Sequence, residues 1–172
     1  MRVVLKNRSP GLTIPDRREL RRLLDRLPTL VEGACACGLG DLAGDVQVIT
    51  VSASAIAKLN ARFLGHAGPT DVLTFDYREA GGSRGNAMDH AVPAEICICP
   101  EVARQASRRY GTTSARELLL YLVHGLLHVA GMDDQDPASR RRMRRAERKV
   151  LAQLEGRVAL TRIFRLAACR EA

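Results

Sequence analysis

Long apolar runs are missing from this 172-residue chain. No segment approaches the roughly 20 consecutive apolar residues that a membrane-spanning helix needs. The N-terminal sequence MRVVLKNRSPG also lacks the apolar core of a secretory signal peptide. These two absences predict a soluble, cytoplasmic protein with no membrane partner.

CxxC motifs are absent, and the number and spacing of the five cysteines exclude two common roles. The five cysteines are an odd number in a chain without an export signal, so we expect no disulfide framework. There is no CxxC motif, and the two CxC pairs are too closely spaced for a zinc knuckle. We therefore expect the cysteines to be reduced thiols that pack as small hydrophobic residues; they are Cys35, Cys37, Cys97, Cys99 and Cys169.

The composition of the chain, with 46% apolar and 27% charged residues, is typical of a globular protein. The length suits one domain with a sizeable core. Neither a linker nor an internal repeat divides the chain, so we expect residues 1–172 to form a single domain.

Basic charge is concentrated in the second half of the chain. The net charge is +8, of which residues 1–100 contribute +1 and residues 101–172 contribute +7. Such an asymmetry indicates an anionic partner, with nucleic acid first and an acidic membrane surface second.

Periodicity predicts an α+β fold, with a small sheet and helices packed around it. Short apolar or alternating segments predict strands at residues 3–5, 45–51, 72–77 and 95–99. Helical spacing predicts helices from Pro15, ended or kinked at Pro28, and at residues 55–63, 100–111, 114–130 and 137–154. A long loop, residues 78–94, has the length of a functional or mobile segment.

The helix at residues 114–130 is apolar on every side, which predicts a central, buried position. Ser114 and Glu117 form a capping-box pattern at its start, and Gly131 is a typical C-terminal stop. A second glycine, Gly125, lies inside the helix at a cost of about 1 kcal/mol. Such a glycine indicates close approach either by another segment of the core or by a substrate.

Two histidines of this helix, His124 and His128, are four residues apart, so their side chains project from one face. Asp134 follows just after Gly131, where the chain can fold back over them. Two imidazoles and a carboxylate suit a zinc ion and leave a coordination position open, as catalytic zinc sites do. The alternative is a pair of ordinary buried histidines. The glutamate of the HExxH protease motif is replaced by Gly125, which disfavours a peptidase.

Residues 124–134, HGLLHVAGMDD, resemble the HGxLHLxGYDH signature of the YbeY family, which comprises bacterial metal-dependent endoribonucleases of ribosomal RNA maturation. Leu59-Asn60, Gly65 and residues 69–75 (PTDVLTF) are similar to the family's LN…G…PTDVLSF block. Residues 94–96 (AEI) stand where the family has Gly-Asp/Glu-Ile. These blocks lie in family order over about residues 45–155.

The resemblance implies the family's fold, in which the motif helix lies beside a mixed four-stranded sheet, and one zinc ion held by His124, His128 and Asp134. Two departures stand out. The family's third ligand is histidine, and an anionic Asp134 in its place makes bound water less acidic and shifts selectivity toward other, harder divalent ions. His90, in the long loop, is an alternative third ligand.

The second departure concerns an arginine. The family's arginine after the aromatic residue of its LN block is replaced by Leu64, with Arg62 on the other side of Phe63.

The helix at residues 137–154 carries a net charge of +6 directly after the histidine motif. Its Met143, Ala146, Val150 and Leu154 form an apolar stripe, and four arginines lie away from that stripe. This arginine ridge, Arg141, Arg144, Arg145 and Arg148, is expected to contact an RNA backbone. Aromatic residues are only 3% of the chain and none lies in the ridge, so base stacking is not expected to dominate.

The expected activity is therefore single-strand-type endoribonucleolytic hydrolysis in ribosomal RNA maturation, with metal-activated water as nucleophile and RNA or a ribosomal subunit, not DNA, as partner. Arg62 and Asp133 are the candidate catalytic residues, as charge stabiliser and general base. Asp133 alternatively orients a histidine, and Glu95 is a second candidate base. The alternative function is an RNA- or ribosome-binding maturation factor with weak or no catalysis.

Overall fold

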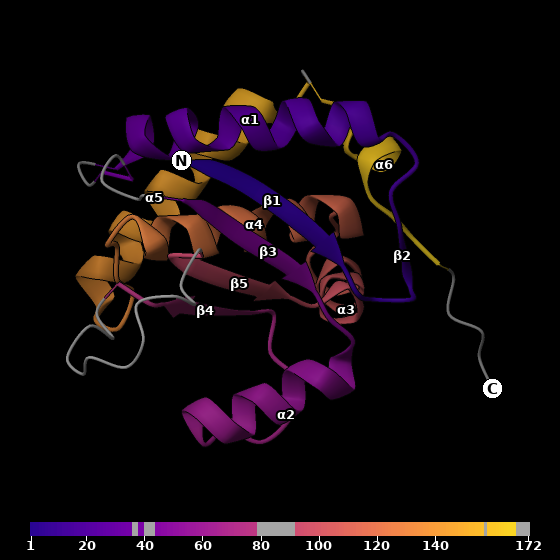
Figure 1. Ribbon diagram of the computed structural model, residues 1–172, viewed down its shortest axis with the longest axis horizontal. Coiled ribbons are helices and arrows are strands. Elements are labelled where there is room, and N and C mark those ends of the chain that lie inside the picture. Colours follow the sequence, from indigo (N-terminus) through magenta and orange to yellow (C-terminus); the bar gives the residue numbers. More distant parts are fainter. Residues whose placement is uncertain (36–37, 40–43, 79–91, 157, 168–172) are drawn as a thin grey trace.

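A computed structural model describes residues 1–35, 38–39, 44–78, 92–156 and 158–167 of the chain. A four-stranded sheet lies at its centre, in the order β1-β3-β5-β4 (Figure 1). The strands are β1 (Arg2–Asn7), β3 (Asp45–Thr50), β5 (Ala94–Ile98) and β4 (Val72–Asp76). Only β4 runs antiparallel to its neighbour, so the sheet is mixed, as expected.

Helices cover both faces of this sheet. On one face lie α1 (Arg17–Ala34), α4 (Ser114–Val129) and α5 (Pro137–Leu154), with α3 (Pro100–Tyr110) beside α4 (Figure 1). The other face is covered by α2 (Ala53–Leu64). None of the helices among the described residues is long and apolar enough to cross a membrane.

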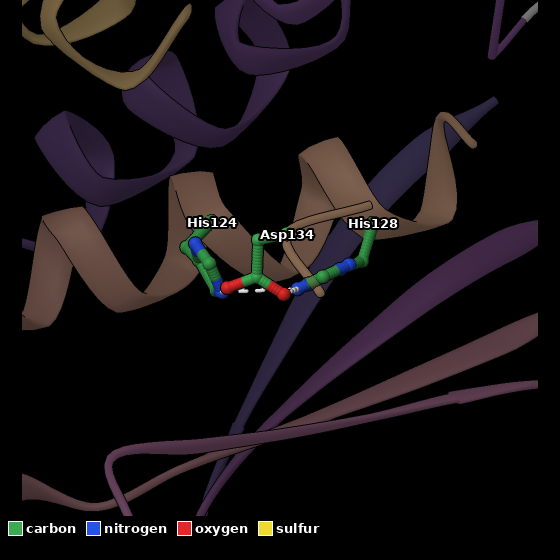
Figure 2. A group of neighbouring side chains, drawn as sticks. All are labelled: His124, His128 and Asp134. Carbon is green, nitrogen blue, oxygen red and sulfur yellow. Dashed lines mark hydrogen bonds and ion pairs between the residues drawn. The ribbon is translucent and has the colours of Figure 1, made fainter. Parts of the chain in front are cut away.

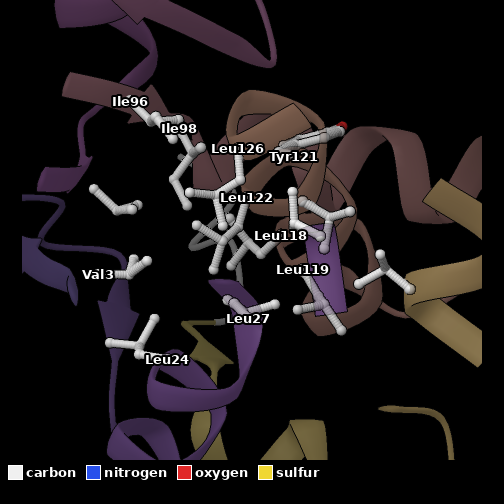
Figure 3. Close-up of a cluster of buried hydrophobic side chains, with 14 of the residues drawn as sticks. Val3, Leu24, Leu27, Ile96, Ile98, Leu118, Leu119, Tyr121, Leu122 and Leu126 are labelled. Atoms are coloured by element: carbon white, nitrogen blue, oxygen red, sulfur yellow. The ribbon is translucent and has the colours of Figure 1, made fainter. Parts of the chain in front are cut away.

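The main core lies between the sheet and α4, as expected of a helix that is apolar all round. Leu118, Leu119, Leu122 and Leu126 of α4 are fully buried and share one core cluster with strand residues such as Ile96 (Figure 3). Alternate residues of the same strands point the other way, so that Ile49 and Cys97 join a second cluster beneath α2. The buried sheet therefore places α4, with its histidines, at the centre of the molecule.

Cysteine packing follows the prediction where the structure describes it. Cys97 and Cys99 are buried, and burial raises the pKa of each thiol to about 11. Cys35 is half-buried at the end of α1. Cys37 and Cys169 lie outside the described residues. The two buried thiols are protonated at neutral pH and serve as small hydrophobic side chains.

The sequence left two outcomes open at Pro28, an end or a kink of the helix, and it predicted the wrong capping residue for α4. The proline at position 28 does not end its helix, because α1 continues to Ala34 with Leu27 and Val31 fully buried on either side of it. That burial outweighs the one backbone hydrogen bond that proline removes. The N-cap of α4 is Thr113, whose hydroxyl accepts from the backbone N–H of Arg116; Ser114 is already helical.

A second, two-stranded sheet was not predicted. It pairs β2 (Leu12–Thr13) with β6 (Arg165–Leu166), just after the short helix α6 (Leu160–Ile163). Strands of two residues leave no periodic pattern in a sequence, and these two are separated by most of the chain. Their pairing ties the segment after β1 to the C-terminal segment.

Candidate metal centre

His124, His128 and Asp134 come together, as their spacing predicted (Figure 2). Both histidines lie on one face of α4, and the chain after Val129 turns back at Gly131, which has a φ of 89°. Each residue offers one ligand atom, and these atoms all lie within 4.8 Å of one another. The Nε2 atoms of the two rings are 3.0 Å apart. The carboxylate oxygens of Asp134 lie 4.0 Å from His124 Nε2 and 3.8 Å from His128 Nε2.

The other ring nitrogen of each histidine is already engaged. His124 Nδ1 lies 2.6 Å from a carboxylate oxygen of Glu147, and His128 Nδ1 lies 3.0 Å from the carbonyl oxygen of Met132. Both partners are acceptors, so each neutral ring carries its proton on Nδ1 and a lone pair on Nε2. With both rings neutral, two lone pairs and a carboxylate thus converge on one point, which is an arrangement that can hold a metal ion.

This donor set fits a divalent metal ion. Ligands about 2.1 Å from a tetrahedral ion are about 3.4 Å apart, which is close to the spacing of the nitrogens and within a small adjustment of the spacing to Asp134. Hydrogen bonds from Nδ1 to a carboxylate and to a carbonyl are also the usual supports of metal-ligating histidines.

Glu147 is the site residue that sequence reasoning missed. It is the one acidic residue of the basic segment 140–149, and that isolation was the available signal. Burial alone would lower the pKa of His124, but the hydrogen bond and charge of Glu147 outweigh it and raise that pKa. Burial and the nearby ring of His124 lower the pKa of His128.

A cavity of about 890 Å³ opens beside His124 and Asp134. Its lining includes Asp71 and its neighbours of the 69–75 block, side chains of α3 and α4, and part of α5. Asp71 is held in place because its carboxylate accepts from the Thr70 hydroxyl and from the backbone N–H of Val72. The first three residues of the 69–75 block, Pro69, Thr70 and Asp71, therefore form one wall of the cavity that His124 also lines.

Gly125 faces the sheet rather than a substrate. A β-carbon on Gly125 would lie 2.5 Å from the Cγ2 atom of Ile96 and 3.3 Å from the hydroxyl oxygen of Thr74. The glycine therefore permits close approach of α4 to β5 and β4, which was one of the two interpretations of the sequence.

The other predicted site residues are placed as follows. Arg62 is exposed and its guanidinium carbon lies 5.3 Å from the ring centre of Phe63, and it does not line the cavity. Asp133 accepts from the backbone N–H groups of Asp134 and Gln135, which shapes the loop. Glu95 accepts from the Tyr77 hydroxyl. The alternative ligand at position 90 lies outside the described residues.

The arginine ridge is exposed along α5, and one of its members, Arg144, lines the cavity together with Arg140. Arg141, Arg145 and Arg148 are not among the lining residues. Arg109 of α3 is a third cavity arginine. Arginine side chains thus line the cavity on both its α3 side and its α5 side.

Most of the chain matches one known protein family. The profile of the family described as "Endoribonuclease YbeY" matches residues 11–155. The chain belongs to the YbeY family.

Individual YbeY proteins agree with this assignment. The chain is 39% identical over 121 residues to the "Endoribonuclease YbeY" of Salinispora tropica, covering 67% of this chain and 76% of that protein. It is 36% identical over 124 residues to that of Elusimicrobium minutum, covering 69% and 82%. A solution structure of a Thermotoga maritima protein superposes with a TM-score of 0.53 at 28% identity, covering 88% of this chain and 90% of that one. The predicted YbeY membership and α+β fold are confirmed.

Proposed function

We propose that this protein is a metal-dependent endoribonuclease that hydrolyses phosphodiester bonds of ribosomal RNA in the cytoplasm. The observation that carries the proposal is the convergence of three metal-ligand atoms at the edge of a cavity that also contains arginines. YbeY relatives bear the name of an endoribonuclease, which agrees with a phosphodiester substrate.

His124, His128 and Asp134 would hold the ion, for which we propose zinc. When bound, a divalent ion supplies Lewis-acid chemistry and activates water at neutral pH. Glu147 and the carbonyl of Met132 each keep a proton on Nδ1 of one histidine, which leaves both Nε2 lone pairs directed at the ion. The chain thus fixes the tautomers of its own ligands before a metal arrives.

Arg140 and Arg144 suit the binding of the phosphate to be cut. Both line the cavity beside His124 and Asp134. Guanidinium groups bind phosphate oxygens through two parallel hydrogen bonds and offset the charge that builds up during displacement. The rest of the arginine ridge, Arg141, Arg145 and Arg148, would contact RNA outside the cavity.

The catalytic roles of Arg62 and Asp133 stay predictions. A role for Arg62 requires that RNA reach α2 outside the cavity. A role for Asp133 as base requires that its carboxylate exchange the backbone bonds that it now accepts.

The test is cleavage of single-stranded RNA by the purified protein, with and without a chelator. We expect cleavage that a chelator stops and added zinc restores, and loss of both bound metal and cleavage in His124→Ala. His66→Ala, which removes an exposed histidine, is the matched control. An unchanged metal content in His124→Ala would contradict the proposed site.

A second function, an RNA-binding maturation factor without catalysis, is favoured by one observation. Leu64 stands where the family has arginine, and the neighbouring Arg62 does not line the cavity. Salt-sensitive binding of RNA without chelator-sensitive cleavage would support this second function and exclude the first.

A further inference from the structure

The cavity extends from the metal centre along α4 toward its N-terminal end. Glu117, Leu120, Tyr121 and His124 all line it, and their spacing puts them on one face of the helix. From Glu117 to His124 the helix rises about 10 Å. That length equals about three nucleotides of a stacked strand at 3.4 Å each. The cavity is therefore longer than the phosphodiester at the metal centre requires.

Its far end is formed by the last two residues of α3, Arg109 and Tyr110. The side chain of Tyr110 is 64% exposed, so it contributes little to the core. The guanidinium carbon of Arg109 lies 5.5 Å from the ring centre, within the range of a cation–π contact. Gly111, with a φ of 66°, ends the helix directly after the tyrosine, so that the ring stands at a turn of the chain.

Among the described residues, Tyr110 and Tyr121 are the aromatic side chains that line the cavity. Tyr121 is 5% exposed, and its ring belongs to the core beneath the cavity (Figure 3). Burial raises the pKa of its hydroxyl, and nearby Asp71, Glu117 and Tyr110 raise it further. Tyr110 is therefore the exposed tyrosine of the cavity lining, with the guanidinium of Arg109 over its ring.

Charge completes the site. Arg109 stands on the α3 side, and Arg140 and Arg144 stand on the α5 side. Glu117, the acidic residue at the same end, is 4% exposed and accepts from the Thr112 hydroxyl, so its charge is largely withdrawn from the surface. A nucleotide has an anionic backbone and a flat base, which match the arginines and the exposed ring respectively.

We propose that Arg109 and Tyr110 form a nucleobase-stacking subsite for single-stranded RNA, about three nucleotides from the bond that is cut. The proposal rests on the proposed function and adds to it a defined place where a base is held. Stacking on tyrosine accepts every base, so the subsite sets the position of the strand rather than its sequence.

The experiment uses the full-length, zinc-loaded protein and a set of single-stranded RNA oligomers. Each oligomer carries an abasic nucleotide at one position, and kcat/KM for cleavage is measured for each. In parallel, 2-aminopurine replaces one base at a time, and its fluorescence reports stacking. We expect one position, about three nucleotides from the cut, at which an abasic nucleotide lowers kcat/KM by between about 5- and 150-fold and 2-aminopurine is quenched.

Tyr110→Ala should lower kcat/KM on unmodified RNA by a similar factor, abolish the quenching, and make the enzyme insensitive to the abasic nucleotide. Tyr110→Phe keeps the ring and should behave as the wild type. The variant that tests the other residue of the subsite is Arg109→Ala. Its control is Arg108→Ala, which removes an arginine of the same helix outside the cavity.

Two different failures are distinguishable. If the wild type cleaves RNA but Tyr110→Ala retains its rate and abasic profile, the subsite is overturned and the proposed function stands. If the wild type neither binds nor cleaves any oligomer, both are overturned.

Discussion

Two different acceptors hold the imidazoles of the metal centre, and they affect the rings differently. The carbonyl of Met132 belongs to the loop that returns Asp134, so it orients His128 as part of the helix end. Glu147 lies on another helix and is charged, so it both orients His124 and raises its pKa. At the residue scale, we therefore expect metal binding to depend on a carboxylate outside the group of His124, His128 and Asp134.

Glu147→Gln should lower the affinity for zinc by about 10- to 100-fold, as loss of such supporting carboxylates does. A proton competes with the metal for the Nε2 atom of His124, and Glu147 raises the pKa of that ring. As the pH is lowered, the zinc affinity of the wild type should therefore begin to fall at a higher pH than that of Glu147→Gln. The difference in zinc affinity between the two proteins should become smaller toward pH 5. Competition with a chromogenic chelator between pH 5 and pH 8 measures both effects.

Glu32→Gln is the control, because it removes an exposed carboxylate of α1. Equal zinc affinity in the wild type and Glu147→Gln across this pH range would contradict the role of Glu147.

Asp134→His tests the departure of this chain from the family signature. A third imidazole replaces an anionic oxygen with a neutral nitrogen, which zinc favours more than manganese does. We expect the ratio of zinc to manganese affinity to rise, and the pH dependence of RNA cleavage to shift toward lower pH. Gln135→His places the same side chain one residue further along the loop as a control. An unchanged metal preference in Asp134→His would show that residue 134 does not contact the ion.

At the scale of helices and strands, the packing of the main core depends on how closely α4 can approach the sheet. Gly125 is the contact point, with Ile96 on β5 and Thr74 on β4 against it. The same helix carries His124 next to this glycine, so the fit of α4 onto the sheet also positions the metal centre.

Gly125→Ala should destabilise the protein even though alanine favours helix. The new methyl group overlaps Ile96 Cγ2, a branch close to the backbone that has little freedom to move. Overpacking of this kind costs about 1–3 kcal/mol, against a helix-propensity gain of about 1 kcal/mol. We expect a net loss of up to about 2 kcal/mol in the free energy of unfolding, measured by urea denaturation.

Gly33→Ala in α1 is the matched substitution, because nothing lies within 4 Å of a β-carbon there. It should raise stability by about 0.5–1 kcal/mol through helix propensity alone. Destabilisation of similar size in both variants would mean that the contact with Ile96 is not the cause.

The elements that the sequence predicted correctly have local signals. Asp136 and Pro137 mark the start of α5, and the alternating residues of β3 and the stripe of α1 carry their periodicity over several residues. The missed features depend on distant contacts. The β2–β6 pair joins Leu12 to Leu166, and Glu147 reaches His124 across 23 positions only because α5 crosses α4. Similarly, the extension of α1 through Pro28 depends on tertiary burial.

For the metal centre, the ligand group was predictable because two ligands share a helix and the third follows a glycine stop. The cavity was not predictable, because it combines residues 69–71, α3, α4 and α5. In particular, no local pattern links Tyr110 with His124. The low aromatic content likewise carried no information about which aromatic side chains line the cavity.

At the scale of the whole molecule, five arginines of α5 divide between two surfaces. Arg140 and Arg144 line the cavity, so they are available to any RNA long enough to reach the metal centre. Arg141, Arg145 and Arg148 are spaced four and three residues apart, which puts them on a neighbouring, exposed stripe of α5 outside the cavity. Only RNA that extends beyond the cavity meets this second surface.

Replacing Arg141, Arg145 and Arg148 by glutamine should therefore weaken binding of long RNA and leave cleavage of a short oligomer unchanged. Each lost contact with a single strand lowers the slope of log affinity against log salt by about 0.7, so the triple variant should lose about 2 from that slope. Arg140→Gln combined with Arg144→Gln should lower the slope by about 1.4 for both lengths, because the cavity binds both. Binding titrations at several salt concentrations, with a short and a long RNA of the same sequence, separate the two surfaces. If the triple variant has the wild-type slope on long RNA, the basic charge outside the cavity only keeps α5 solvated.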